Sequence, residues 1–90
     1  MNPAHPNWQY VYILHSQAKD KYYVGCTNNL ETRIAQHMQG RALSTKSMLP
    51  VELVYYEAYR SKTHAYNREK NLKHYGTGLS RLKARIGWAG

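Results

Sequence analysis

The chain has 90 residues, enough for one domain with a modest hydrophobic core, so a site must lie on an open face rather than in a deep cavity. Thirteen Lys and Arg against five Asp and Glu give a formal net charge of +8. The single cysteine, Cys26, excludes an internal disulfide and a cysteine-based zinc cluster.

The positive charge is concentrated in the last third of the chain. Residues 1–59 hold five basic and four acidic side chains, a net of +1, whereas residues 60–90 hold eight basic side chains and only Glu69, a net of +7. A basic segment favours a polyanion through counterion release and electrostatic steering. A solvated face that promotes solubility explains the same charge without a partner. A membrane surface is disfavoured because no long helix combines a basic face with a clean apolar one.

A loose lead-in and a hairpin are predicted at the N-terminal end. Residues 1–7 contain two prolines and polar side chains and form the lead-in. "WQYVYILHS" (8–16) is rich in aromatic and β-branched residues, which suit a pleated surface. "QAKDK" is the expected turn, and "YYVGC" (22–26) the returning strand.

The alternation of side chains in this hairpin assigns its tyrosines to faces. Tyr10, Tyr12 and Leu14 should share one face of the first strand. Tyr22 and Tyr23 should point to opposite faces of the second strand.

The period then changes to that of a helix, predicted over 29–39. Leu30, Ile34 and Met38 recur every four residues and should form its buried stripe. Asn28, followed three residues later by a glutamate, is the expected N-cap of a capping box.

The remaining elements complete an α+β domain. "RALSTKSMLP" (41–50) is a polar loop, "VELVYYEAY" (51–59) a third strand, and 61–76 and 79–87 two further helices. The order is ββαβαα, so we expect a small three-stranded, mainly antiparallel sheet flanked by helices. Residues 8–87 should form this single domain.

Several polar side chains should converge beside the first helix. Arg33 and His37 are four residues apart and project from one face, at the border of the core. Tyr12 and Tyr23 lie on the hairpin, which must pack near this helix because the connection is short. Gly25 leaves room there for a backbone or a phosphate.

Each of these residues also has a plainer interpretation. Strand tyrosines are more often half-buried packing, and a lone helix arginine is usually solvated. A lone histidine is usually not catalytic. Glu69, among basic neighbours, is typical of a surface ion pair.

The order of these residues resembles the GIY-YIG nuclease family. The tripeptides "YVY" and "YVG", about ten residues apart, resemble its paired signature. Arg33 matches the family's helix arginine, and His37 matches the histidine often found one turn later. Glu69, in "NREKNLK", matches the metal-binding glutamate. The resemblance covers roughly residues 8–86 and is greatest to small stand-alone members.

The resemblance implies a phosphodiester hydrolase with Tyr12, Tyr23, Arg33 and His37 as catalytic residues. Glu69 would anchor Mg²⁺ or Mn²⁺, and Arg33 offers a permanently charged fork for phosphate oxygens. A tyrosine can accept the proton of a water only if its pKa falls well below roughly 10. Either Tyr12 or Tyr23 is that base, and the other positions the water or binds phosphate. His37 would orient groups or share the proton transfer.

The implied substrate is DNA, single-stranded or branched, with RNA also open, and the implied role is DNA repair or recombination. We expect little sequence specificity, with affinity dominated by phosphate contacts. The chain begins without an apolar signal segment and contains no apolar run of about 18 residues, so we expect a cytoplasmic protein without membrane contact. The residues expected to bind the substrate are Gly25, Thr27, Thr45, Lys46, Arg68 and Lys70.

Three departures from the family pattern bear on activity. Tyr10 replaces the glycine of the first motif, Cys26 stands where some catalytic relatives carry a lysine, and no asparagine follows Glu69 at the distance seen in several relatives. The last two favour an alternative, a catalytically weak or inactive nucleic-acid-binding module of the same fold. A basic protein that docks on an acidic partner is the third option.

Overall fold

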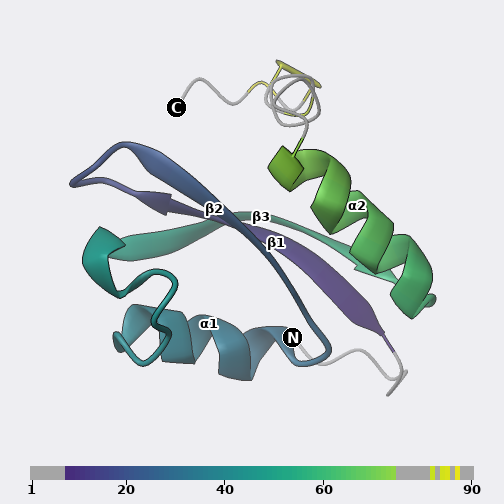
Figure 1. Ribbon diagram of the computed structural model, residues 1–90, viewed down its shortest axis with the longest axis horizontal. Helices are drawn as coiled ribbons and strands as arrows, with labels where there is room; N and C mark the ends of the chain where they lie inside the picture. The colour runs from purple at the N-terminus through teal and green to yellow at the C-terminus, as the bar shows by residue number, and fades with distance from the viewer. Residues whose placement is uncertain (1–7, 75–81, 83, 86, 88–90) are drawn as a thin grey trace.

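The computed structural model describes residues 8–74 and, beyond them, residues 82, 84, 85 and 87. The elements follow in the order β1 (Gln9–Ser16), β2 (Lys21–Thr27), α1 (Leu30–Met38), the short 3₁₀ turn η1 (Lys46–Met48), β3 (Val51–Tyr59) and α2 (Lys62–His74) (Figure 1). The strands form one sheet in the order β2-β1-β3, with both pairings antiparallel. The predicted α+β class is therefore confirmed. The expected lead-in over 1–7 lies outside the described residues, and the expected last helix over 79–87 lies largely outside them.

The register of the β1–β2 hairpin determines which residues of the candidate site lie opposite each other. Tyr12 pairs with Gly25, and Leu14 pairs with Tyr23. The turn ends at Asp20, whose φ of 48° lies in the left-handed region that aspartate tolerates. The Asp20 carboxylate lies 3.0 Å from His15 Nε2, across the turn.

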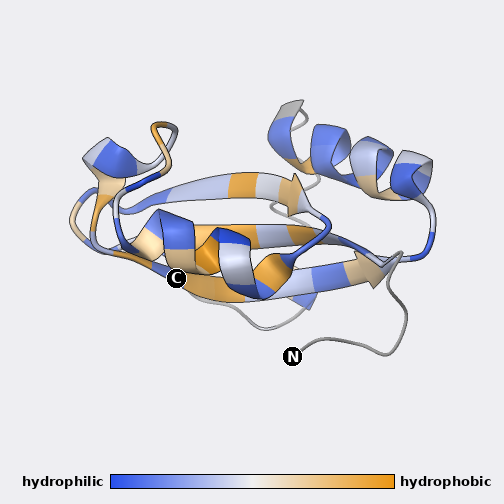
Figure 2. Cartoon of the chain, turned by 90° about the horizontal axis from the view of Figure 1, so that it is seen from below, coloured by the Kyte–Doolittle hydropathy of each residue, from blue (hydrophilic) through white to orange (hydrophobic). Residues whose placement is uncertain are grey.

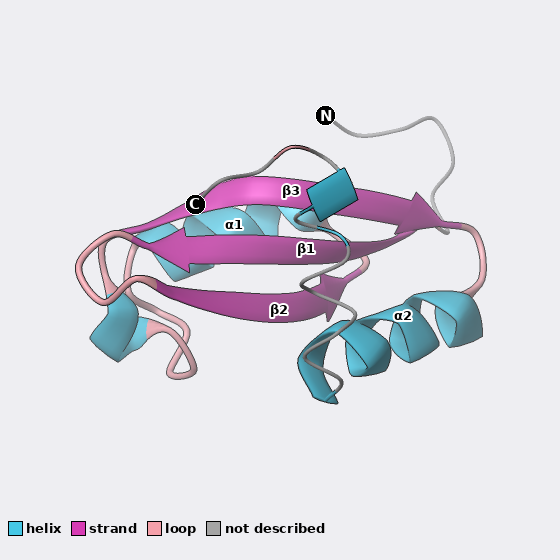
Figure 3. Cartoon of the chain, turned by 90° about the horizontal axis from the view of Figure 1, so that it is seen from above, coloured by secondary structure: helices cyan, strands magenta, loops and turns pink. Residues whose placement is uncertain are grey.

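The two faces of the sheet carry separate hydrophobic clusters, as the alternation predicts. Figure 2, seen from below, shows α1 in front of the strands, and Figure 3, seen from above, shows it behind them. The cluster beneath α1 consists of Tyr10, Tyr12, Leu14, Leu30 and Val51, with Tyr23 packed against it. The cluster on the α2 face consists of Val11, Ile13, Val24, Ala65, Leu72 and Leu82, with Tyr22 packed against it.

Helix α1 begins one residue later than predicted. Asn29, not Asn28, is the N-cap, because its side-chain oxygen accepts the Thr32 N–H at 3.2 Å. The Thr27 hydroxyl in turn accepts the Asn29 N–H at 3.1 Å, which fixes the entry of the chain into the helix. At the other end Gly40, with φ of 76°, provides the left-handed residue that terminates the helix.

The buried side of α1 also differs from the predicted stripe. Met38 is 56% exposed, whereas His37 is fully buried together with Leu30. A helix advances about 100° per residue, so positions 30, 34 and 37 span a narrower arc than 30, 34 and 38. The helix therefore turns His37 into the sheet and leaves Met38 at the margin.

Helix α2 packs on the sheet through Ala65 and Leu72 and is also tied to it by polar contacts. Ser61 caps it by accepting the His64 N–H at 3.2 Å. Arg68 donates from Nε and Nη2 to the two carboxylate oxygens of Glu57 on β3, at 2.9 and 3.0 Å. Much of α2 is hydrophilic in Figure 2. Among the described residues, none of the helices has the length and apolar character that crossing a bilayer requires.

Candidate active site

A buried row of three polar side chains runs from β1 through α1 to the following loop. Tyr12 Oη lies 2.8 Å from His37 Nε2, and His37 Nδ1 lies 2.7 Å from Thr45 Oγ1. Tyr12 is 1% exposed and the other two residues 0%. Because both ring nitrogens are hydrogen-bonded, the imidazole is fixed in place and orientation.

Burial governs the ionisation of this row. Burial raises the pKa of Tyr12 to about 12, against the opposing hydrogen bond and positive charge of Arg33, while negative charge at Tyr23 and Glu69 raises it further. Burial and the Arg33 charge lower the pKa of His37 from its ordinary value. Both side chains are therefore neutral at pH 7. The lowering that a tyrosine base needs is outweighed at Tyr12, because burial raises its pKa by more than the neighbouring Arg33 lowers it.

Gly25 is required by Tyr12 rather than by a ligand. A Cβ built on Gly25 would lie 2.4 Å from both Cζ and Oη of Tyr12. The space that the sequence suggested would remain open for a backbone or phosphate is therefore filled by the Tyr12 ring. The glycine of the second motif lets the tyrosine of the first motif lie flat across the sheet.

Arg33 and Tyr23 lie at the outer side of the row. Arg33 donates to the side-chain oxygen of Gln36 at 3.0 Å and acts on the ionisation of both Tyr12 and His37. The Tyr23 ring lies 5.3 Å from the His37 ring and 6.3 Å from the Tyr12 ring, centroid to centroid. Tyr23 is only half-buried, so it is the tyrosine of the pair that solvent reaches more readily.

The second helix reaches the same place around the edge of β2. Lys73 Nζ lies 3.4 Å from a carboxylate oxygen of Glu69 and 5.7 Å from the centroid of the Tyr23 ring. Tyr23 faces α1, whereas α2 packs on the opposite face, so Lys73 must pass the outer side of β2. Figure 3 shows α1 and α2 on opposite sides of the sheet, with α2 beside β2. Helices on opposite faces thus contribute side chains to one site at the sheet edge.

Glu69 suits a single-carboxylate site for a hydrated divalent cation. Its side chain is 16% exposed, and its only hydrogen-bonded partner among the described residues is Lys73. Over the same residues, no three His, Cys, Asp or Glu side chains gather closely enough to share a metal ion. One carboxylate with several waters and substrate oxygens is an arrangement that Mg²⁺ commonly accepts.

Two of the residues expected to bind the substrate serve the fold instead. Thr45 is fully buried and bonds His37, so its predicted contact with nucleic acid is wrong. Arg68 is engaged by Glu57 through both oxygens, and the hydroxyls of Tyr55 and Tyr59 donate to the same carboxylate.

The other expected binding residues remain at the surface. Lys46 on η1 and Lys70 on α2 are exposed, whereas Thr27 is half-buried and tied to the N-cap of α1. Cys26 is half-buried, and burial raises the pKa of its thiol, which disfavours a nucleophilic thiolate.

Sequence reasoning did not identify Lys73 or the true partner of Thr45. Lys73 follows Glu69 by four residues, and that spacing alone predicts an ion pair on one helix face. Its position over Tyr23 has no signal in the sequence, because it depends on how α2 packs. Thr45 lies in a loop, where no periodicity indicates burial.

The chain is similar to a known family and to several known proteins. A family model of the GIY-YIG catalytic domain matches residues 9–77. A UPF0213 protein of Natronomonas pharaonis is 44% identical over 75 residues, which are 82% of this chain and 82% of the relative. UPF0213 proteins of Staphylococcus haemolyticus and Clostridium perfringens are each 47% identical over 66 residues, which are 71% of this chain and 78% and 69% of the relatives. No solved structure matches the chain. With its paired tyrosines, helix arginine and glutamate in the matched range, the chain belongs to the GIY-YIG catalytic domain family.

Proposed function

We propose that the protein is a divalent-metal-dependent nuclease that hydrolyses phosphodiester bonds in DNA. The observation that carries the proposal is a series of contacts at the edge of β2. The neutral Tyr12–His37 pair lies beside the Tyr23 ring, Lys73 lies over that ring, and Glu69 of the opposite helix pairs with Lys73. Phosphodiester hydrolysis needs a proton acceptor for water, positive charge on the phosphoryl oxygens and help for the leaving oxygen. The site offers a group for each need.

The proton acceptor is the Tyr12–His37 pair. Tyr12 takes a proton from the attacking water at Oη as its own proton passes to His37 Nε2, so no phenolate has to exist at rest. His37 Nδ1–H donates to Thr45 Oγ1 before and after the transfer, and the resulting imidazolium keeps that partner. General-base catalysis of this kind contributes about 10²- to 10⁴-fold to the rate.

Arg33 and Tyr23 bind the scissile phosphate. The Arg33 guanidinium is planar, permanently charged and half-buried beside the Tyr12 hydroxyl, which suits contact with two phosphate oxygens. Tyr23 is the more exposed tyrosine, so we assign its hydroxyl to the substrate and the base function to Tyr12.

Glu69 would hold the cation, Mg²⁺ or Mn²⁺, after releasing Lys73. A bound divalent cation polarises the phosphoryl group and offsets the charge that develops on the leaving oxygen. Lys73, freed from its 3.4 Å contact, remains beside the Tyr23 ring, where its ammonium can face the same phosphate.

The test is cleavage of labelled single-stranded, duplex and branched DNA with Mg²⁺ or Mn²⁺. We expect Glu69→Gln and Tyr12→Phe each to lower the cleavage rate at least about 100-fold. Glu52→Gln is the matched control, because Glu52 is an exposed carboxylate on β3, the edge strand opposite to β2. Equal cleavage by all these proteins would point to a contaminating nuclease and reject the proposal.

The same substrates test the alternative, a nucleic-acid-binding module without turnover. Cys26, standing where some catalytic relatives have a lysine, is the observation that favours it. DNA binding that weakens with rising salt but never leads to cleavage would support the module.

A further inference from the structure

Four residues of α2 form a single line along the helix. Lys62, Tyr66, Glu69 and Lys73 are separated by four, three and four residues, so they share one face. That face is turned towards β2. Lys62 and Tyr66 lie beside Cys26 of β2, and Lys73 lies over the ring of Tyr23 on the same strand, so the line follows β2.

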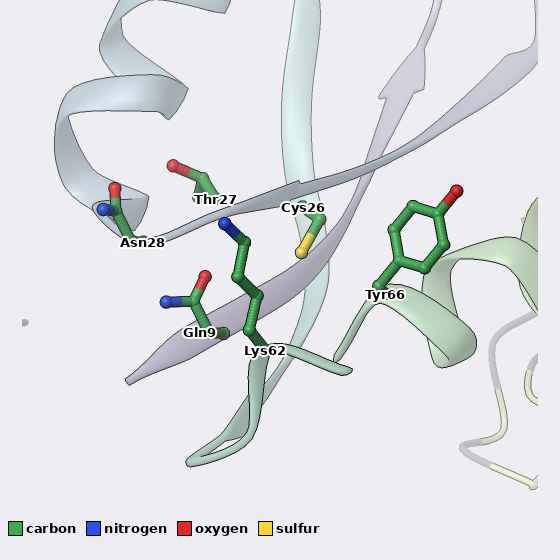
Figure 4. Close-up of a pocket in the computed structure, with 6 residues that line it drawn as sticks. All are labelled: Gln9, Cys26, Thr27, Asn28, Lys62 and Tyr66. Atoms are coloured by element: carbon green, nitrogen blue, oxygen red, sulfur yellow. The ribbon is translucent and has the colours of Figure 1, made fainter. Parts of the chain in front are cut away.

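The N-terminal half of this line borders an open depression beside the end of β2. Figure 4 shows Tyr66 on one side, Thr27 and Asn28 on the other, and the Lys62 side chain between them. Tyr66 is 59% exposed, a large aromatic surface left open to solvent. The residues that line the depression are Gln9, Cys26, Thr27, Asn28, Lys62 and Tyr66.

The polar groups around the depression are not used by the fold. Within the described part of the chain, no hydrogen bond or ion pair engages the side chains of Gln9, Asn28, Lys62 or Tyr66. Two carboxamides that both donate and accept, an ammonium and an open aromatic ring therefore face the same solvent space.

We propose that this depression binds an unpaired nucleotide of the substrate, with its base stacked on Tyr66. Lys62 would meet the adjoining phosphate, and the carboxamides of Asn28 and Gln9 would meet the edge of the base. A base within a duplex has both faces covered by its neighbours, so only an unpaired nucleotide can use the ring. The inference rests on the proposed function for the identity of the polymer.

The position of the depression relates it to the site of cleavage. Tyr66 precedes Glu69 by three residues, one helical turn, so their Cβ atoms are neighbours about 5–6 Å apart. A nucleic acid strand that runs along α2 from Lys62 towards Lys73 would place the phosphate next to the stacked base near the Glu69 carboxylate. The preferred substrate is then a nucleic acid with an unpaired nucleotide beside the cut, such as a single strand or a flap.

The experiment compares two labelled oligomers of equal length, oligothymidylate and a fully abasic phosphodiester, by fluorescence anisotropy in EDTA. We expect Tyr66→Ala to bind oligothymidylate about 5- to 150-fold more weakly than wild type. It should bind the abasic oligomer as wild type does, because the phosphate contacts remain. Tyr66→Phe should keep wild-type binding to both.

Tyr56→Ala is the matched control, because Tyr56 is 43% exposed but lies on β3 away from the depression. It should leave both affinities unchanged. An equal loss on the two oligomers, or no loss on oligothymidylate, would overturn the proposal.

Binding is measured in EDTA, which prevents metal-dependent cleavage. The result for Tyr66 therefore does not depend on whether the protein is a nuclease. Tyr66-dependent binding in a protein that never cleaves would reject the nuclease and support the base site. Normal cleavage with unchanged binding in Tyr66→Ala would reject the base site alone.

Discussion

Tyr12 is held between two residues that are distant in the sequence, Gly25 and His37. A methyl group at position 25 would overlap the end of the Tyr12 ring, at 2.4 Å from Oη. We expect Gly25→Ala to displace the ring, to break its bond to His37 and to lower the free energy of unfolding by about 1–3 kcal/mol. Urea denaturation gives that value, and the cleavage rate should fall with it.

The control for this prediction is Gly25→Ala in a protein that lacks the Tyr12 ring. In a Tyr12→Ala background the added methyl meets open space, so Gly25→Ala should cost much less than in wild type. An equal cost in both backgrounds would show that the glycine serves the backbone and not Tyr12.

Thr45 acts on the site only through His37. In Thr45→Val the shape is nearly kept, but His37 Nδ1 loses its partner in the core. An unpaired buried polar group costs about 1–3 kcal/mol, so we expect a loss of stability of that size together with slower cleavage.

Thr45→Ser supplies the matched control, since it keeps the hydroxyl. It should restore both the unfolding midpoint and the pH dependence of cleavage. If Thr45→Val cleaves as fast as wild type at every pH, the hydroxyl does not orient the imidazole.

At this scale the sequence indicated which residue types converge but not how each is used. The position of His37 one turn after Arg33 predicted that it would border the core near the tyrosines, and it lies against Tyr12. The pairing of Arg68 with Glu57 could not be predicted, because the partner comes from another element eleven residues away. Basic residues look alike in a sequence until their acidic partners are located.

Helix α1 shows what pattern reading resolves at the scale of an element. Its predicted bounds, 29–39, differ from Leu30–Met38 by one residue at each end. The prediction of its buried face is less accurate, because the apolar period of Leu30, Ile34 and Met38 gives no signal for a buried His37. A histidine with a partner for each nitrogen can be buried as deeply as a leucine.

Helix α2 is joined to β3 by one charged cluster. Burial raises the pKa of the Glu57 carboxyl, but hydrogen bonds from Arg68, Tyr55 and Tyr59 outweigh it and leave the pKa below its ordinary value. We expect Arg68→Lys to lower the free energy of unfolding by about 1–3 kcal/mol, because an ammonium cannot donate to both oxygens from one plane.

The effect of Arg68→Lys should extend to the site, since Glu69 is the next residue on α2. Cleavage at saturating substrate should slow while the affinity for DNA in EDTA stays close to wild type. Lys70→Arg, an exposed exchange of the same two residue types on the same helix, should change neither quantity. Wild-type stability in Arg68→Lys would contradict the anchoring role of this cluster.

At the scale of the whole molecule, the fold class followed from the sequence because a short turn forces antiparallel pairing. The central place of β1 is explained by its near-continuous burial, whereas β2 and β3 alternate with more exposed residues. The packing of α2 around the sheet edge could not be predicted, because it depends on contacts between distant segments. The sequence therefore predicted which residues belong to the site at this edge, but not how they are arranged.

Alkaline pH should unfold the protein before its buried tyrosines ionise in the native state. The pKa of Tyr12, of Tyr55 and of Tyr59 is raised to about 12, in each case chiefly by burial. These residues ionise near pH 10 when unfolded, so the native state holds more protons between pH 10 and 12, and stability falls as pH rises through that window. The loss of the folded circular dichroism signal and the tyrosinate absorption of these three residues should therefore occur together. Complete tyrosinate absorption from all nine tyrosines in a protein that keeps its folded circular dichroism signal would contradict this.

The route of Lys73 around β2 has a consequence for solubility. An outer strand presents unpaired N–H and C=O groups to any other chain, and proteins commonly block such edges with lysines or a covering helix. Here the ammonium beside Tyr23 and the flank of α2 occupy the approach to β2. The catalytic proposal thus places substrate on the side from which another chain would extend the sheet at β2, so a bound strand of nucleic acid would also shield the protein from self-association along that edge.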